Sequence, residues 1–250
     1  MTPKERAIIL VKAWPQPSKR YGETVCCAGV TPQGEWRRLF PIRYRHLAGA
    51  NKFSRWDVLE YGWHRPKDDP RRESRRVDEA SLRIVGKMKE REREGFFDRL
   101  LRQSTADAYE RGESLTLIRP KSLSFRAKRK SDREMEADAS RRDRALAQKD
   151  MFDPDLKRLP ICHYALRIQY EDSAGDHGGM CGDWETTWTF MKWRSEYGEA
   201  ETIKRLKERY EQEYMDNGVA LALGTVHKRP RQWLLLGVVR LDEAKQASLF

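Results

Sequence analysis

Long apolar stretches are missing from this sequence. No apolar run approaches the roughly 18 residues that a membrane-spanning helix needs, and residues 1–6 show no signal-peptide pattern. We therefore expect no membrane insertion or export by a visible route, and a cytoplasmic protein. Cysteine is also scarce, since four cysteines in 250 residues do not make a disulfide framework. We interpret all four as buried thiols used for packing: Cys26, Cys27, Cys162 and Cys181.

Acidic residues are fewer than basic ones. The chain has 50 Lys and Arg against 39 Asp and Glu, which gives a formal net charge of +11. This imbalance favours a polyanion, DNA or RNA, as the partner, and a location on the nucleoid. The 38% hydrophobic fraction is enough for one sizeable core or two small ones, so the chain should fold.

The order of apolar patterns predicts an α+β fold. Residues 1–77 indicate a β-rich, barrel-like module, with strands at 7–11, 23–30 and 35–42 and a hairpin turn at 31–34. Residues 78–150 indicate a connector, with a helix from Asp78 to Leu101, a strand pair at 114–118 and 122–126, and a charged segment at 131–150 that is either an exposed helix or a mobile lid. Residues 151–241 indicate an α+β domain with a mixed sheet and one long amphipathic helix, 198–218, and residues 242–250 a flexible tail.

Cations and aromatic rings alternate around the third predicted strand. Trp36, Phe40 and Tyr44 lie among four arginines, and single-stranded nucleic acid is bound by this mixture of stacking rings and phosphate-tracking cations. The candidate nucleic-acid-binding residues here are Arg37, Arg38, Arg43, Tyr44 and Arg45. The alternative is that these arginines snorkel around core aromatics.

Two further basic clusters could contact phosphates. Four arginines fall within six residues, and a predicted hairpin tip between strands 219–223 and 232–240 carries three cations and a histidine. A solvated loop and a plain basic turn are the respective alternatives. The residues are Arg71, Arg72, Arg75 and Arg76 in the first cluster, and His227, Lys228, Arg229 and Arg231 in the second.

A glycine-rich segment, residues 171–185, is expected to form a loop and is the best candidate for chemistry. His177, Asp183 and Glu185 could form a metal-dependent nuclease site, with the two carboxylates holding Mg²⁺ or Mn²⁺ and His177 as the general base. The alternative is that Asp183 caps a helix that contains Trp188. Zinc is less favoured, because the spacing of the possible ligands fits no standard signature: Cys162, His163, His177 and Cys181.

The last five residues are Gln246, Ala247, Ser248, Leu249 and Phe250. They resemble the peptide by which bacterial proteins bind the replicative sliding clamp, the β subunit of DNA polymerase III. That resemblance implies that the Leu-Phe pair fills an apolar cleft of the clamp, while the Gln and Ser positions complete the motif. Ala247 departs from the pattern, since Leu is frequent there. The alternative is that the pair folds back onto the protein.

These observations together favour a DNA-binding protein that is recruited to the sliding clamp in replication, repair or defence. Two other function classes stay open: a metal-dependent nuclease built on the glycine-rich segment, and an RNA-binding accessory protein whose tail matches by chance.

Overall fold

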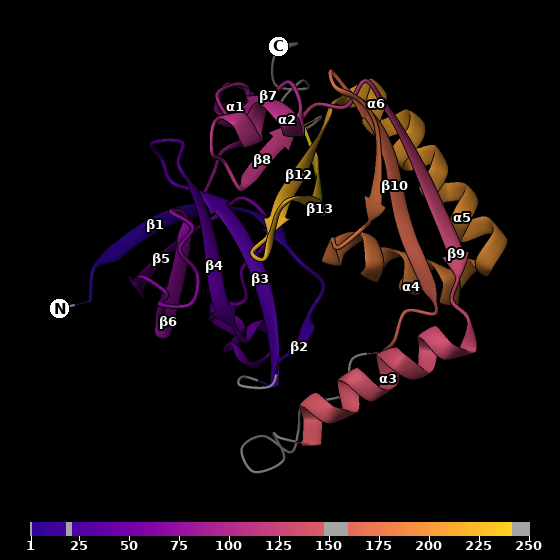
Figure 1. Cartoon of the computed structure of the whole chain (residues 1–250), viewed down its shortest axis with the longest axis horizontal. Helices are drawn as coiled ribbons and strands as arrows, with labels where there is room; N and C mark the ends of the chain where they lie inside the picture. Colours follow the sequence, from indigo (N-terminus) through magenta and orange to yellow (C-terminus); the bar gives the residue numbers. More distant parts are fainter. Residues whose placement is uncertain (1, 19–21, 148–159, 242–250) are drawn as a thin grey trace.

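The computed structural model describes residues 2–18, 22–147 and 160–241. It confirms the α+β class, with a β-rich N-terminal lobe and a C-terminal lobe of sheets and helices (Figure 1). The predicted domain boundaries stay a prediction.

The N-terminal lobe is a closed barrel. The sheet order is β1-β5-β6-β4-β3-β2, and β1 also pairs with β3, which closes five strands into a ring. All pairings are antiparallel except the one between β4 and β6. The strands are β1 (Lys4–Lys12), β2 (Gln16–Ser18), β3 (Gly22–Val30), β4 (Trp36–Ile42), β5 (Asp57–His64) and β6 (Ser74–Lys87).

Alternation of apolar and polar residues explains the barrel, because one set of side chains fills the interior. Ile9, Leu39 and Leu59 are fully buried there. Between β4 and β5 the chain forms two short 3₁₀ helices, η1 (Tyr44–His46) and η2 (Gly49–Asn51), and then places Phe53 in the same core. The prediction of a β-rich, barrel-like module at the N-terminus is therefore confirmed.

The C-terminal lobe has two sheets. One has the order β13-β12-β8-β7 and the other β11-β10-β9. The strands are β7 (Leu101–Arg102), β8 (Leu115–Ile118), β9 (Ser122–Arg129), β10 (Tyr164–Asp172), β11 (Gly175–Met180), β12 (Val219–Val226) and β13 (Arg229–Arg240). The helices are α1 (Glu90–Asp98), α2 (Thr105–Glu110), α3 (Asp132–Ala147), α4 (Trp184–Tyr197), α5 (Glu199–Lys207), the π turn η3 (Glu208–Glu213) and α6 (Tyr214–Asn217).

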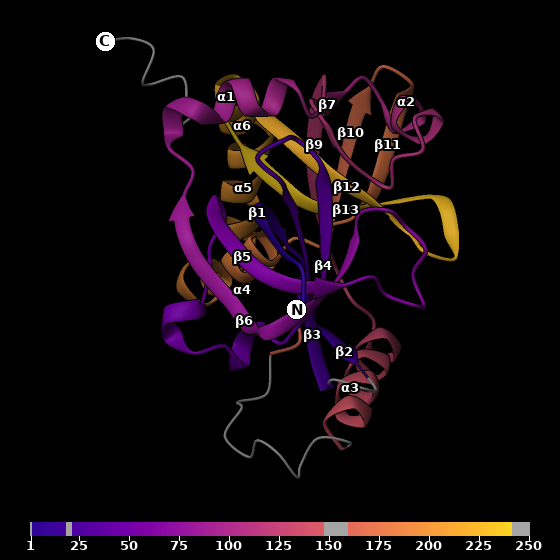
Figure 2. The same cartoon turned by 90° about the vertical axis from the view of Figure 1, so that its left-hand side faces the viewer.

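The two lobes share a hydrophobic core. Ile8 and Val30, on the outer face of the barrel, pack in one cluster with Leu115, Ala220 and Phe97 of the C-terminal lobe. Figures 1 and 2 show the β12–β13 hairpin of the C-terminal lobe alongside the barrel strands, and α3 beside the far ends of β2 and β3. Since burial of apolar surface drives packing, this shared cluster holds the lobes in a fixed relation.

The predicted helix from Asp78 to Leu101 is wrong in its first half. Residues up to Lys87 continue strand β6, and the helix α1 begins only at Glu90. Leu82 and Val85 have helical spacing, but Leu82 points into the barrel while Val85 is exposed. Pairing with β5 decides the conformation here, and its register irregularities blur the strand periodicity.

Other predicted elements were closer to the structure. The long helix is present as α5, η3 and α6, although six of its residues form a π turn. The charged segment is helical over Asp132–Ala147. Of the four cysteines, three are buried, whereas Cys26 is exposed on β3.

Candidate nucleic-acid interface

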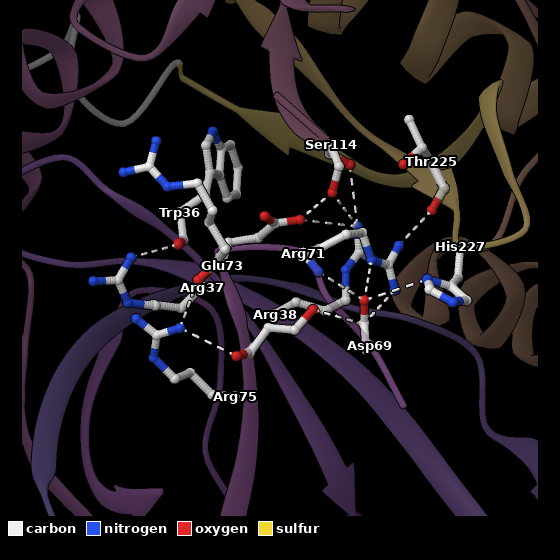
Figure 3. Close-up of polar contacts among 12 residues, drawn as sticks. Trp36, Arg37, Arg38, Asp69, Arg71, Glu73, Arg75, Ser114, Thr225 and His227 are labelled. Atoms are coloured by element: carbon white, nitrogen blue, oxygen red, sulfur yellow. Dashed lines mark hydrogen bonds and ion pairs between the residues drawn. The ribbon is translucent and has the colours of Figure 1, made fainter. Parts of the chain in front are cut away.

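The structure brings together two basic clusters that lie far apart in the sequence. The loop between β5 and β6, residues 65–73, meets the tip of the β12–β13 hairpin, residues 227–231 (Figure 3). Arg71 Nη1 donates a hydrogen bond of 2.9 Å to the carbonyl oxygen of Thr225, and His227 Nδ1 lies 3.4 Å from Asp69 Oδ1. We call these two segments, with the outer face of β3 and β4 beside them, the hairpin–loop surface.

Arg71 fixes the geometry of this surface. Its guanidinium makes a two-pronged contact with Asp69, at 2.8 Å from Nε to Oδ1 and 2.7 Å from Nη2 to Oδ2. Burial alone would raise the pKa of Asp69, but hydrogen bonds from Arg71 and Ser74 outweigh it and hold that pKa well below its usual range. Arg71 is therefore part of the scaffold, and it ties the loop to the hairpin.

Arg38 lies beneath the same surface, and its side chain is 12% exposed. Its Nη2 donates to the carbonyl oxygen of Ser114 at 3.1 Å and lies 4.0 Å from Glu73 Oε1. Burial, together with the nearby charge of Arg71, lowers the pKa of Arg38 to about 10. The residue stays charged at neutral pH, and within the described part of the chain its Nε has no hydrogen-bond partner.

Two other residues that were predicted to bind nucleic acid make ion pairs within the barrel. Arg37 Nε and Arg75 Nε both donate to Glu5, at 2.6 Å and 3.1 Å, and the hydroxyl of Tyr61 contacts the same carboxylate at 3.0 Å. Arg75 also stacks on Trp63, with 3.9 Å from its guanidinium carbon to the ring centre. These contacts differ from both interpretations of Arg75, because it lies on strand β6 and pairs with Glu5 instead of standing in a solvated loop.

The remaining predicted residues of the barrel lie against other parts of the barrel. Arg43 Nε donates to Glu79 at 2.7 Å, and Arg45 Nη1 donates to Glu23 at 2.9 Å. The Tyr44 hydroxyl donates to the carbonyl oxygen of Phe53 at 2.6 Å. Arg76 is partly buried on β6, opposite His64.

Exposed cations nevertheless gather on the hairpin–loop surface. In its two segments the one exposed carboxylate is Asp68. Six cations are exposed there: Arg65, Lys67, Arg72, Lys228, Arg229 and Arg231.

Two exposed aromatic rings accompany these cations. Tyr109 of α2 is 40% exposed, and its ring centre lies 5.5 Å from the guanidinium carbon of Arg231. Phe40 on the outer face of β4 is 37% exposed. The sequence did not single out Arg65, Lys67 or Tyr109, because nothing local shows that α2 and the 65–73 loop approach the hairpin.

The glycine-rich segment is a strand rather than a loop. Residues Gly175–Met180 pair with β10 as the edge strand β11. His177 Nε2 lies 2.9 Å from Asp172 Oδ1, and its ring stacks on Tyr170 with 5.1 Å between ring centres. His177 is thus paired with a buried carboxylate that the sequence did not single out.

Asp183 caps the helix α4, as the alternative interpretation had it. Its Oδ2 accepts from the Thr186 amide at 3.0 Å and from the Thr186 hydroxyl at 2.8 Å. Burial raises the pKa of Asp183 to about 6, although Arg55 opposes this. Glu185 pairs with the same Arg55 at 3.0 Å.

His177 does not complete a metal site with these two carboxylates. Among residues 2–18, 22–147 and 160–241, no group of three or more His, Cys, Asp and Glu is placed to hold a metal ion. That finding covers both the predicted Mg²⁺ or Mn²⁺ site and the less favoured zinc set. The nuclease interpretation therefore has no ligand cluster to rest on in the described chain.

The clamp-binding peptide lies outside the described residues, which end at Leu241. It stays a prediction. Over the part of the chain that the structure describes, no helix is both long enough and apolar enough to cross a membrane.

The fold defines the class of protein. If β1, β3, β4, β5 and β6 are numbered one to five, the closed barrel has the strand order 1-2-3-5-4-1, and its third and fifth strands are parallel. This is the topology of an OB-fold barrel. Here it is joined to a larger α+β lobe.

The particular family follows from comparison with known proteins. Residues 94–250 match the family model described as "Domain of unknown function (DUF8757)", so the chain belongs to that family. Residues 3–103 match a second model, "Domain of unknown function (DUF8758)". No curated protein matches the chain. A chain from the structure titled "Structure and Conformational Change of a Replication Protein A Heterotrimer Bound to ssDNA" is 10% identical with a TM-score of 0.30, and the match covers 99% of this chain and 67% of that one. A similarity of this size decides nothing about function.

Proposed function

We propose that this protein binds single-stranded DNA on the hairpin–loop surface and is brought to the sliding clamp by its last five residues. The observation that carries the first part is the meeting of two exposed basic segments beside the barrel. In OB-fold barrels the second and third strands, with the loops that follow strands one and four, are the usual surface for oligonucleotides. Here those strands are β3 and β4, and the loop after the fourth strand is 65–73.

Fold similarity alone does not assign function, so the proposal depends on the chemistry of the surface. Phosphates need cations that are accessible, and the bases need exposed rings on which to stack. The hairpin–loop surface and its neighbourhood offer six exposed cations with Phe40 and Tyr109. The partly buried ion pairs of Arg38 and Arg71 hold the two segments in place before DNA arrives, which reduces the entropy lost on binding.

The experiment is a titration of fluorescent oligothymidylate at several salt concentrations. Replacing Lys228, Arg229 and Arg231 by Ala should weaken binding and reduce the slope of log K against log salt by about 2, because each phosphate contact on a single strand contributes about 0.7. The matched control removes three exposed cations from α4 and α5, namely Lys192, Lys204 and Arg205. We expect that control to keep the parental slope. An unchanged slope in the hairpin variant would place the DNA elsewhere.

Recruitment to the clamp would add to this affinity. A tether to a ring that encircles DNA raises the local concentration of the basic surface, so two modest interactions act together. The support for this part is the match of Gln246, Ser248, Leu249 and Phe250 to the clamp-binding pattern.

A further inference from the structure

A polar pocket lies at the other end of β13 from the hairpin tip. Its volume is ≈ 290 Å³, close to the lower end of the range for small-molecule sites, about 300 Å³. It is lined by residues of the η2–β5 connection, α4, η3, α6 and β13, including Arg55, Asp183, Arg209, Tyr210, Tyr214 and Arg240.

Three guanidinium groups converge on this pocket from different parts of the chain. Arg55 precedes β5, Arg209 belongs to the π turn, and Arg240 ends β13. All three line the pocket together with Tyr214. Burial raises the pKa of Tyr214, and the three guanidinium charges oppose that rise. Such a convergence is typical of sites that bind an anion.

Packing orients these arginines. Arg55 Nη1 donates to the carbonyl oxygen of Val238 at 2.6 Å, and its Nη2 lies between Asp183 and Glu185, at 3.6 Å and 3.0 Å. Arg209 stacks on Trp193 and Arg240 on Tyr214, at 4.2 Å and 5.1 Å from the ring centres. Side chains held in this way lose little entropy when a ligand binds.

The helix geometry at the pocket indicates a site rather than a structural ion-pair network. Asp183 and Glu185 also line the pocket and both face Arg55, so the positive charge left for a ligand comes mainly from Arg209 and Arg240. The π turn Glu208–Glu213 interrupts the helix at the arginine and tyrosine that line the pocket. π turns are rare, and they occur frequently at functional sites.

Glu213 lies near two of the arginines that line the pocket. Its two carboxylate oxygens lie 3.9 Å from Arg209 Nε and 3.7 Å from Arg240 Nη2, which is longer than a good hydrogen bond. This side chain is about half exposed, so it can turn into solvent. A phosphate can approach both arginines with short, paired hydrogen bonds, which a carboxylate at this distance does not make.

We propose that this pocket binds a phosphate monoester, whose oxygens displace Glu213 from Arg209 and Arg240 while Arg55 faces the same space. The phosphate can belong to a free sugar phosphate or to the phosphorylated end of a nucleic-acid strand. The site is independent of the hairpin–loop surface, since it shares no residue with it.

Calorimetric titration with ribose 5-phosphate and with ribose tests the proposal. We expect the parent protein to bind the phosphorylated sugar and not the free one. Arg240→Gln and Arg209→Gln should each weaken binding about tenfold or more, as expected for loss of a charge-assisted hydrogen bond. Glu213→Gln should instead tighten it severalfold, because the internal competitor is removed, and Lys192→Gln should change nothing.

The opposite signs of these effects separate a site from a stability effect. If ribose 5-phosphate fails to bind, or if Glu213→Gln and Arg240→Gln shift affinity in the same direction while both variants keep the parental melting temperature, the proposal is wrong. Oligothymidylates with a 5′-phosphate and with a 5′-hydroxyl then distinguish the sources. A preference for the phosphorylated strand that Arg240→Gln removes, and that the Lys228, Arg229 and Arg231 variant retains, assigns the pocket to strand ends, whereas equal binding of both strands assigns it to free sugar phosphates.

Discussion

At the scale of single residues, several charged side chains form ion pairs with little exposure to solvent. Asp183, Arg38 and Glu5 are each largely buried, and each meets an opposite charge from a distant part of the sequence. Removing one member of such a pair leaves a buried charge uncompensated, which costs about 3–5 kcal/mol. Loss of DNA binding in an Arg38 variant would therefore have to be separated from loss of folding.

The effect of one buried charge on stability can be tested at Asp183, because burial raises its pKa to about 6 from an ordinary 3.8. Between these pH values the folded state binds more protons than the unfolded state, so the contribution of Asp183 to stability falls as pH rises from about 4 to about 6. Asp183→Asn keeps a good N-cap residue but does not titrate. We expect the melting temperature of this variant, relative to the parent, to increase between pH 4 and pH 7.

Thermal melts of both proteins across that range give the answer. A difference in melting temperature that stays constant with pH would show that Asp183 is ionised throughout. Asp183→Ala is the useful contrast, because it also removes the cap on Thr186 and should destabilise by about 1 kcal/mol or more at every pH.

At the scale of elements, the local sequence pattern predicts those helices and strands whose conformation is not changed by contacts with distant parts of the chain. The strands at 219–223 and 232–240 and the long helix could be predicted, because their apolar periodicity matches their burial. Strand β6 could not, since its many charged residues lie on the outside of a barrel and its pairing is irregular. The cap at Asp183 was visible in the sequence, but its partner Arg55 was not, because 128 positions separate them.

The closure of the barrel by β1 and β3 gives a prediction at this scale. Gly29 lies opposite Ile9, and a Cβ added there would come 2.6 Å from the backbone oxygen of Ile8. We expect Gly29→Ala to destabilise the protein by about 1–3 kcal/mol, as overpacking does. Gly86→Ala on β6 is the control, because nothing lies within 4 Å of its added Cβ.

Urea unfolding of the two variants measures the difference. If both glycines tolerate alanine equally, β1 and β3 are not closely paired at this point, and the barrel is open.

At the scale of the whole molecule, the hairpin–loop surface exists only because the lobes are packed together. Arg71 and Asp69 of the barrel contact Thr225 and His227 of the C-terminal lobe. Sequence alone identified Arg72 and the cations of the hairpin but not Arg65 and Lys67, and a single sequence carries no signal that the two segments meet. The six exposed cations are therefore a property of the assembled molecule.

The tail gives the prediction that concerns recruitment. Replacing Leu249 and Phe250 by Ala should abolish binding to purified clamp and leave folding and affinity for bare DNA unchanged, because an apolar anchor supplies most of the energy of a short peptide. Ala247→Leu should tighten clamp binding, since Leu is frequent at this position of the pattern. Surface plasmon resonance on immobilised clamp measures both. Undiminished binding by the double alanine variant would refute the motif.

The central claim is that single-stranded DNA lies across the hairpin–loop surface, and cross-linking tests it most directly. Ultraviolet cross-linking of oligothymidylate followed by peptide mass spectrometry reports which side chains touch the bases. We expect adducts on Phe40, on Tyr109, or in residues 65–73 and 227–231, and their loss when Lys228, Arg229 and Arg231 are replaced. Adducts confined to the helices α4 and α5, or unchanged by those replacements, would contradict the assignment.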